Sequence, residues 1–195
     1  MSDSCRWSIR KAEKKGVTIE EAQDDDFVEE YYQQLQDVFK KQSLVPTYGK
    51  ERVRDLILSL SASGNLLLLK ARDPNRQCIA TGIFLAGNGT MYFWGGASWR
   101  AGQHYRPNET IHWYAMKYWK ARGMRRYDMG GGEYKGKFGG KRIEVPWIWK
   151  SKYPGLRHCR NLIKQIVRWR QIALGRVGYF WTTKKRRAAS YTFLV

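Results

Sequence analysis

A stretch of fourteen residues at 127–140, YDMGGGEYKGKFGG, contains six glycines, two lysines and three aromatic residues. Glycine destabilises regular elements, so such a cluster marks turns with positive φ or a close approach of the main chain to another group. Asp128 has two interpretations. It could take a proton from an amine through water, or it could cap the turn by accepting N–H groups of the glycines, and the second role is favoured.

The composition indicates an anionic partner. Thirty-six Lys and Arg residues against 17 Asp and Glu give a formal net charge of +19. Nucleic acid fits this charge best, because Lys and Arg that neutralise phosphates release counterions. The nine Trp and twelve Tyr residues also offer faces on which bases can stack. A basic protein without such a ligand is the alternative.

A second basic segment, RAGQHYRPNE at 100–109, precedes a predicted helix. Arg100, His104 and Arg106 offer side chains to an anion, and the helix start at Asn108 offers main-chain N–H groups. An RNA acceptor end would suit this segment, and these four residues are the predicted tRNA-binding set. The alternative is a solvated basic turn that caps a helix.

The cysteines and histidines predict neither a metal site nor a nucleophilic relay. The three cysteines are far apart and lack CxxC or Cys/His spacing, which indicates a reducing compartment. The three histidines pair with no Ser or Cys, so each is expected to be a packing or surface residue. The first 16 residues contain no apolar run, and no apolar stretch reaches the ~18 residues of a membrane span. We therefore predict a cytoplasmic protein.

Hydrophobic periodicity and turn residues predict the elements. Asp24 is the expected N-cap of the second helix, and the tail at 182–195 shows no clear element. In chain order, the sequence predicts a helix at 10–16, a strand at 17–22, helices around 27–39 and 53–60, strands at 65–73, 77–87 and 90–98, a helix at 106–123, strands at 125–131 and 143–150, and a basic helix at 156–174.

These elements predict an α/β (α+β) fold with a mixed central sheet and helices on both faces. The strands at 90–98 and 125–131 are joined by a right-handed crossover, so they are expected to be parallel neighbours. The paired glycines that begin at Gly95 suggest a bulge that splays the fourth strand from the fifth, leaving unpaired main-chain groups in a cleft. We expect one domain at 1–175 and a basic tail at 176–195.

This succession resembles the GNAT acyltransferase fold, in which an acyl donor enters the gap between the fourth and fifth strands. Three motifs, IRKAEKKGV at 9–17, YDMGG at 127–131 and YKGKFGG at 134–140, resemble the second half of the Fem-type (FemABX-like) peptidyltransferases. The resemblance covers roughly residues 7–150. Members of that family move an amino acid from aminoacyl-tRNA to an amine, typically in peptidoglycan precursors. They usually carry two such domains, whereas this chain has room for one.

The resemblance implies roles for the motif residues. Lys135 lies at the position of the family's functional lysine, with Tyr134 in place of the usual Phe. Aminolysis of an ester needs a donor that holds the carbonyl oxygen as it gains charge, which Lys135 or an N–H group near Trp94 could supply. Lys135 could instead position the terminal phosphate or sugar of the RNA. The predicted catalytic residues are Lys135 and Asp128, and the predicted substrate-binding residues are Tyr134, Lys137, Phe138, Trp94, Gly95, Gly130 and Gly131.

The sequence therefore predicts a tRNA-dependent aminoacyltransferase that needs no cofactor and acts on a peptide or peptidoglycan precursor. The Q/RxxGxG/A loop with which acetyl-CoA enzymes of this fold hold pyrophosphate is absent. The alternatives are a CoA-dependent N-acetyltransferase and a non-enzymatic RNA-binding module. Contact of the last basic helix with a membrane surface, and pairing with a second GNAT-like domain or a second copy, are further expectations.

Overall fold

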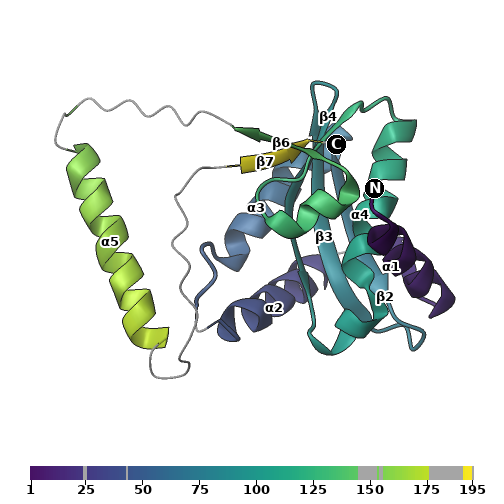
Figure 1. The fold of residues 1–195 in the computed structure, drawn as a ribbon, viewed down its shortest axis with the longest axis horizontal. Helices are drawn as coiled ribbons and strands as arrows, with labels where there is room; N and C mark the ends of the chain where they lie inside the picture. The colour runs from purple at the N-terminus through teal and green to yellow at the C-terminus, as the bar shows by residue number, and fades with distance from the viewer. Residues whose placement is uncertain (24–25, 43, 145–152, 154–155, 176–190, 195) are drawn as a thin grey trace.

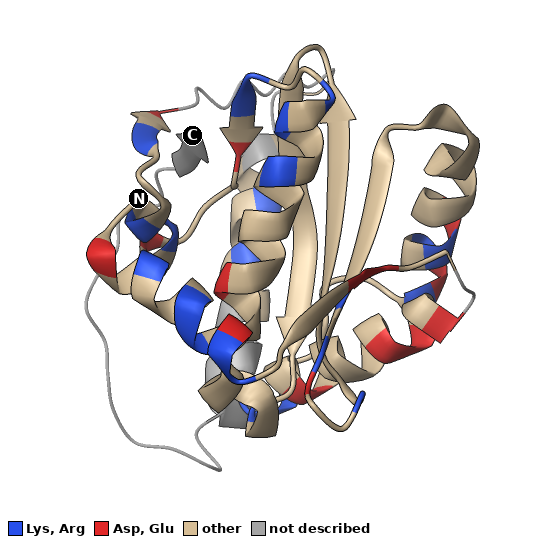
Figure 2. Cartoon of the chain, turned by 90° about the vertical axis from the view of Figure 1, so that its right-hand side faces the viewer, with Lys and Arg blue, Asp and Glu red and all other residues tan. Residues whose placement is uncertain are grey.

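The computed structural model describes residues 1–23, 26–42, 44–144, 153, 156–175 and 191–194. Within them, helices cover both faces of a mixed sheet, as Figure 1 and the side view in Figure 2 show. The predicted α/β fold class is therefore confirmed.

The elements follow one another much as the periodicity predicted. The helices are α1 (Asp3–Lys14), α2 (Asp26–Lys40), α3 (Lys50–Leu60), α4 (Pro107–Ala121) and α5 (Leu156–Gly175), with short 3₁₀ helices η1 (Ser61–Ser63), η2 (Ala101–Tyr105) and η3 (Glu133–Phe138). The strands are β1 (Thr18–Glu21), β2 (Leu66–Arg72), β3 (Cys78–Gly87), β4 (Thr90–Ser98), β5 (Arg126–Asp128), β6 (Lys141–Glu144) and β7 (Tyr191–Leu194).

The seven described strands lie in the order β1-β2-β3-β4-β5-β7-β6. Strands β1 to β4 are antiparallel neighbours, and β4 and β5 are parallel, as the crossover through α4 requires. Asn88 and Gly89 join β3 to β4 with φ of 50° and 71°, the two positive angles of a type I′ turn. Between β2 and β3, Asp73 accepts the N–H groups of Asn75 and Gln77 at 3.0 and 2.9 Å.

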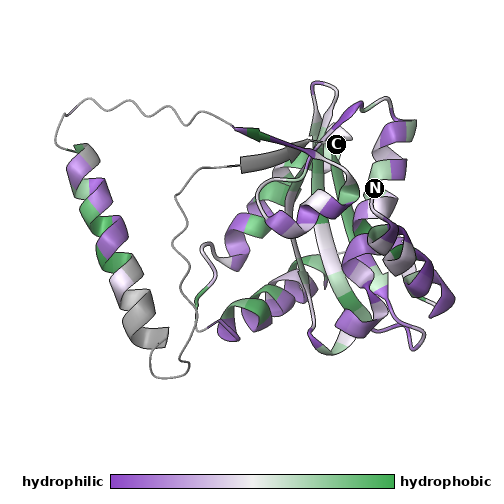
Figure 3. Cartoon of the chain, viewed as in Figure 1, coloured by the Kyte–Doolittle hydropathy of each residue, from purple (hydrophilic) through white to green (hydrophobic). Residues whose placement is uncertain are grey.

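The sheet divides the core into two clusters. Helices α1 and α4 pack on one face, and α2 and α3 pack on the other. Leu67 and Leu69 of β2 belong to the first cluster and Leu68 to the second, because successive side chains of a strand point to opposite faces. Figure 3 shows apolar residues along the central strands and on the helices beside them.

Helix α1 begins seven residues earlier than predicted. Ser2 caps it, since its hydroxyl accepts the N–H of Cys5 at 3.3 Å. Cys5, Ile9 and Ala12 then recur at helical spacing and are buried in the cluster beneath α4. The helix ends before Gly16, whose φ of 76° suits the position after a helix.

The C-terminal tail contains a strand that the sequence analysis did not predict. Strand β7 pairs with β6 over four residues and with β5 through Asp128–Leu194. The prediction was wrong because four residues are too few for a periodic pattern, and pairing with the sheet defines the strand.

Two other predictions fall partly outside the described residues. The proposed N-cap Asp24 lies outside them, as does most of the strand expected at 143–150. Its described part is the exposed strand β6, which begins two residues earlier, at Lys141.

Candidate active site

The fourth and fifth strands diverge, as predicted. Their ladder contains three pairs and ends at Tyr92–Asp128, while β4 continues to Ser98. Trp94 interrupts the register of β4 with β3 as the extra residue of a bulge, immediately before the glycine pair. A bulge increases the local twist of a strand, which turns β4 away from β5. We call the space beyond Tyr92 and Asp128 the strand gap.

Lys135 lies in the strand gap. Its side chain is only 6% exposed, and its ammonium donates a hydrogen bond to the carbonyl of Met129, just after β5. The same nitrogen lies 4.6 Å from the ring centroid of Phe93 on β4. Burial lowers the pKa of Lys135, and the charge of Asp128 opposes this effect. The residue that the motif singled out therefore contacts both sides of the gap.

Three aromatic rings pack together beside Lys135: His112 and Tyr127 are buried, and Phe93 is half-buried. The ring of His112, from α4, lies 4.6 Å from that of Phe93, and its Nδ1 lies 2.5 Å from the hydroxyl of Tyr127 on β5. Burial lowers the pKa of His112 to about 3, and the charges of Lys135 and Lys137 act in the same direction. His112 is thus a neutral packing residue, as expected for the histidines, but its place in the site was not predicted.

The buried histidine predicts a stability that falls with acid. Above a pH of about 6.5 the imidazole is neutral in both the folded and unfolded chain; below it, the unfolded chain binds a proton that folded His112 excludes. Between pH 7 and 5 this linkage lowers the free energy of unfolding by about 2 kcal/mol. Urea denaturation at several pH values measures it. His112→Gln, which keeps a partner for Tyr127, should flatten the slope, and equal slopes in both proteins would contradict the assignment.

Asp128 caps the glycine turn. Its Oδ1 accepts the N–H of Gly130 at 2.7 Å, and Gly130 has a φ of 65°, in the left-handed region that favours glycine. Gly130 and the exposed Gly131 carry the chain from the end of β5 to η3. This geometry matches the capping role favoured from the sequence, and a role of Asp128 as a base stays a prediction.

The 3₁₀ helix η3 carries the remaining motif residues. Lys137 forms an ion pair with Glu109 in the first turn of α4 at 2.7 Å, and its carbonyl accepts the N–H of Ser2 at 2.8 Å. Phe138 is buried in the core, whereas the side chain of Tyr134 is half exposed. Tyr134 and Lys137 therefore lie where a substrate could meet them, while Phe138 supports η3 from within.

Trp94 and Gly95 border the gap from the other face of the sheet. The ring of Trp94 lies 5.1 Å from that of Tyr48, and it lines an open hollow of about 380 Å³ against α3. A Cβ atom at Gly95 would lie 2.6 Å from the hydroxyl of Tyr31, which itself lies 2.6 Å from that of Tyr48. The predicted site is thus split between the two faces, with Lys135 beneath α4 and Trp94 beneath α3.

The predicted RNA-binding residues gather at the start of α4. Arg100, His104 and Arg106 are exposed. The Asn108 side chain donates to Ser98 Oγ at 3.3 Å and so ties the helix start to the end of β4. The ion pair between α4 and η3 places this segment next to the residues of the strand gap.

Helix α1 adds basic and aromatic residues that the sequence analysis assigned to no site. Lys11 Nζ and the Arg106 guanidinium lie 4.5 and 6.0 Å from the ring centroid of half-exposed Trp7. Lys15 Nζ lies 5.4 Å from the ring centroid of Tyr105. Trp7 and Lys11 lie four residues apart on one face of α1, and Lys15 follows at the same spacing as the C-cap; this spacing was the available signal. We call Trp7, Lys11, Lys15, Tyr105 and Arg106 the basic aromatic patch. Figure 2 shows the Lys and Arg residues along α1.

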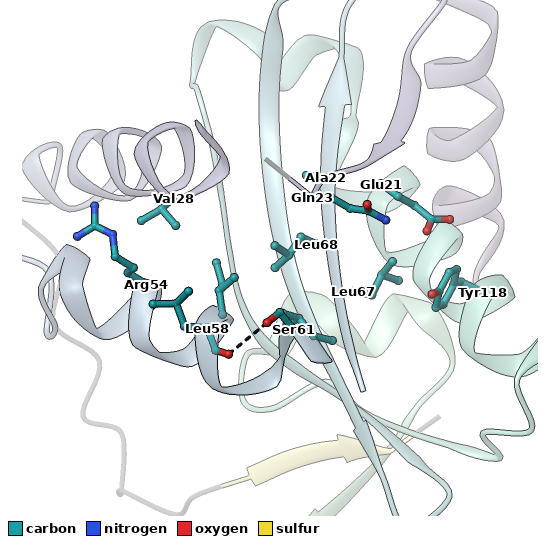
Figure 4. Close-up of a pocket in the computed structure, with 12 residues that line it drawn as sticks. Glu21, Ala22, Gln23, Val28, Arg54, Leu58, Ser61, Leu67, Leu68 and Tyr118 are labelled. Carbon is teal, nitrogen blue, oxygen red and sulfur yellow. Dashed lines mark hydrogen bonds between the residues drawn. The ribbon is translucent and has the colours of Figure 1, made fainter. Parts of the chain in front are cut away.

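A larger hollow lies elsewhere. It measures about 720 Å³ and opens between α3, β2 and the end of β1 (Figure 4). Leu68, Arg54 and Tyr118 are among its lining residues, and its Glu21 is held by the hydroxyl of Tyr114 at 2.7 Å. None of the residues at the strand gap lines this hollow. Its size alone therefore does not make it the reaction site.

The described part of the chain contains no group of three or more His, Cys, Asp or Glu residues that could hold a metal ion. Among the same residues, no helix has the length and apolar character needed to cross a membrane.

A mixed sheet whose fourth and fifth strands part, with helices on both faces, is the arrangement expected of an acyltransferase of the GNAT fold. The model of the acetyltransferase (GNAT) domain family matches residues 2–138. This range covers more than half of the chain, and the chain belongs to that family.

Solved structures share this fold at low sequence identity. FemX superposes with a TM-score of 0.61 and 14% identity, over 80% of this chain and 52% of FemX. A GNAT-family acetyltransferase from Staphylococcus aureus Mu50 gives 0.56 and 11% identity, over 71% of this chain and 92% of its own. A GCN5-related N-acetyltransferase from Kribbella flavida gives 0.54 and 10% identity, over 69% and 87%.

The chain spans about half the length of FemX. Comparison with curated proteins gave no match. The family assignment to GNAT rests on the domain model, and the similarity to FemX, at 14% identity, shows a shared fold alone.

Proposed function

We propose that this acyltransferase moves an amino acid from aminoacyl-tRNA to the amine of a peptide or peptidoglycan precursor. The start of α4 is the observation that carries the proposal. Pro107 occupies the first turn and lacks an N–H, and the carboxylate of Glu109 is already buried in that turn. A pyrophosphate bound there would meet one main-chain donor fewer, beside a carboxylate that already uses Lys137 as its partner.

The basic aromatic patch supports RNA as the donor's carrier. A half-exposed Trp ring with a Lys and an Arg near it offers apolar surface and positive charge together, which suits an unpaired RNA end. The patch joins the strand gap through α4 and η3, because Glu109 of α4 pairs with Lys137 of η3. A terminal nucleotide on the patch could thus place its ester at the gap.

The reaction is a direct aminolysis. The uncharged acceptor amine attacks the ester carbonyl, a C–N bond forms, and the carbonyl oxygen gains negative charge. The C–O bond to the ribose then breaks, the amine loses a proton, and the ribose oxygen takes one up. The ammonium of Lys135 or main-chain N–H groups of β4 beyond Tyr92 would hold the charged oxygen. The acceptor would enter from the Trp94 side, where an open hollow meets β4.

Labelled substrates test this function. We would incubate the protein with radiolabelled aminoacyl-tRNAs and a small-molecule filtrate of a cell extract, with labelled acetyl-CoA in a parallel arm. We expect label to move from tRNA into a small peptide, and we expect no transfer when the aminoacyl-tRNA is treated with RNase before the reaction. Lys11→Glu/Arg106→Glu should raise the KM for aminoacyl-tRNA by about tenfold and weaken its salt dependence.

The matched control is Lys120→Glu/Arg125→Glu, which changes the net charge equally at exposed positions away from the patch. Equal effects of the two double variants would show that only overall charge matters and would contradict the patch.

A CoA-dependent N-acetyltransferase is the second candidate, and the GNAT family match supports it. Transfer from acetyl-CoA that resists RNase would establish this alternative and overturn aminoacyl transfer. Specific RNA binding without transfer in either arm would instead indicate a binding module.

A further inference from the structure

Helix α5 presents a broad apolar face to solvent. Leu162, Ile166 and Trp169 are spaced four and three residues apart, and Ile163 and Val167 extend the face by four-residue spacing. All five side chains are exposed: the fractions are 60% for Leu162, 59% for Ile163, 57% for Ile166, 48% for Val167 and 69% for Trp169. Figure 1 shows the helix apart from the sheet and its covering helices. Nothing in the described part of the chain therefore covers this face.

The charge of α5 is of one sign. Its sequence contains five Arg and Lys residues and no Asp or Glu. Arg160 and Lys164 are four residues apart, on a side of the helix adjacent to the apolar face. A helix with a broad aliphatic face, a basic flank and a Trp at the edge of its apolar face matches the surface of an anionic bilayer.

We propose that α5 binds a membrane surface that contains anionic lipids, lying in the headgroup region with its aliphatic face toward the acyl chains. This binding does not depend on which acyl donor the protein uses. The aliphatic side chains exclude RNA as the better partner, since phosphates and bases would match the basic flank and leave Leu162, Ile163 and Ile166 in water. A second copy would bring two helices without acidic residues together, and their like charges would repel.

Vesicle flotation with the full chain tests the proposal. The wild type should float with vesicles of phosphatidylcholine and phosphatidylglycerol, bind phosphatidylcholine alone much more weakly, and partly dissociate at high salt. Ile163→Glu/Ile166→Glu should weaken binding by at least tenfold, about the effect of two charges on the apolar face. Asn161→Glu/Gln165→Glu adds the same charge at exposed polar positions and should stay within about threefold of the wild type.

Circular dichroism checks that each variant is folded, and Trp169→Ala gives a milder variant with an expected loss of about threefold. Equal weakening by both glutamate pairs, or unchanged flotation of Ile163→Glu/Ile166→Glu, would overturn the proposal. The proposal would also fail if Ile163→Glu/Ile166→Glu lost tRNA binding while keeping vesicle binding. A wild-type dimer in light scattering that becomes a monomer in this variant would likewise overturn it, in favour of a contact between two copies.

Discussion

Lys135→Met should lower kcat/KM for acyl transfer by about 10²–10³-fold, as removal of an oxyanion donor does in other enzymes. Methionine keeps the long unbranched stem beside Phe93 and removes only the ammonium. Because that ammonium is buried and its pKa is lowered by burial, its removal should leave the free energy of unfolding unchanged or raise it. Loss of activity without loss of stability distinguishes a functional lysine from a structural one.

Initial rates over a range of donor concentrations, together with urea denaturation, measure both effects. Lys141→Met changes an exposed lysine just after the same segment and serves as the control. A fall in kcat indicates charge stabilisation in the transition state, whereas a rise in KM alone would assign Lys135 to positioning the donor. Wild-type turnover in Lys135→Met would reject a role for this lysine in the reaction.

Glu30→Gln should lower the free energy of unfolding by about 3 kcal/mol. Lys70 is 1% exposed in β2, and its ammonium lies 2.7 Å from the carboxylate of Glu30 on α2. The substitution removes the anion from a lysine that the sheet keeps out of water. This is far more costly than losing an ion pair at the surface.

The adjacent residue provides the control. Glu29→Gln breaks an ion pair with Lys50 whose length, 2.8 Å, is close to the 2.7 Å of the Glu30–Lys70 pair. The side chains of Glu29 and Lys50 are, however, 52% and 35% exposed. Urea midpoints should therefore move for Glu30→Gln and stay near the wild-type value for Glu29→Gln. Similar shifts in the two variants would contradict a special role for the buried lysine.

The parts of the fold that local chemistry determines were predicted correctly. The meander β2–β4 follows from apolar runs separated by DPNR and GNGT, because the turn residues fix the hairpins without long-range information. The parallel contact of β4 and β5 follows from the handedness of crossovers. Strand β7 depends on pairing with β5 and β6, which are distant in the sequence, and no local pattern predicted it. The early start of α1 had a local signal, the N-cap Ser2 and the helical spacing of Cys5, Ile9 and Ala12, which the prediction did not use.

The candidate site divides in the same way. Lys135 and Asp128 stand out by their motif, and the structure places both beside the strand gap. The packing of His112 against Phe93 and Tyr127 joins three elements, so only the folded chain brings these rings together. The sequence assigned Trp7 no role because the predicted helix began only at residue 10.

Trp94 and Lys135 lie on opposite faces of one sheet, so in the proposed reaction the donor and the acceptor would not need to share an entrance. Each could arrive and depart through its own opening and meet the other only where β4 has left β5. If the proposed reaction holds, one co-substrate could then be exchanged while the other stays bound. The gap between β4 and β5 would then be the place where substrates bound on the two faces of the sheet come into contact.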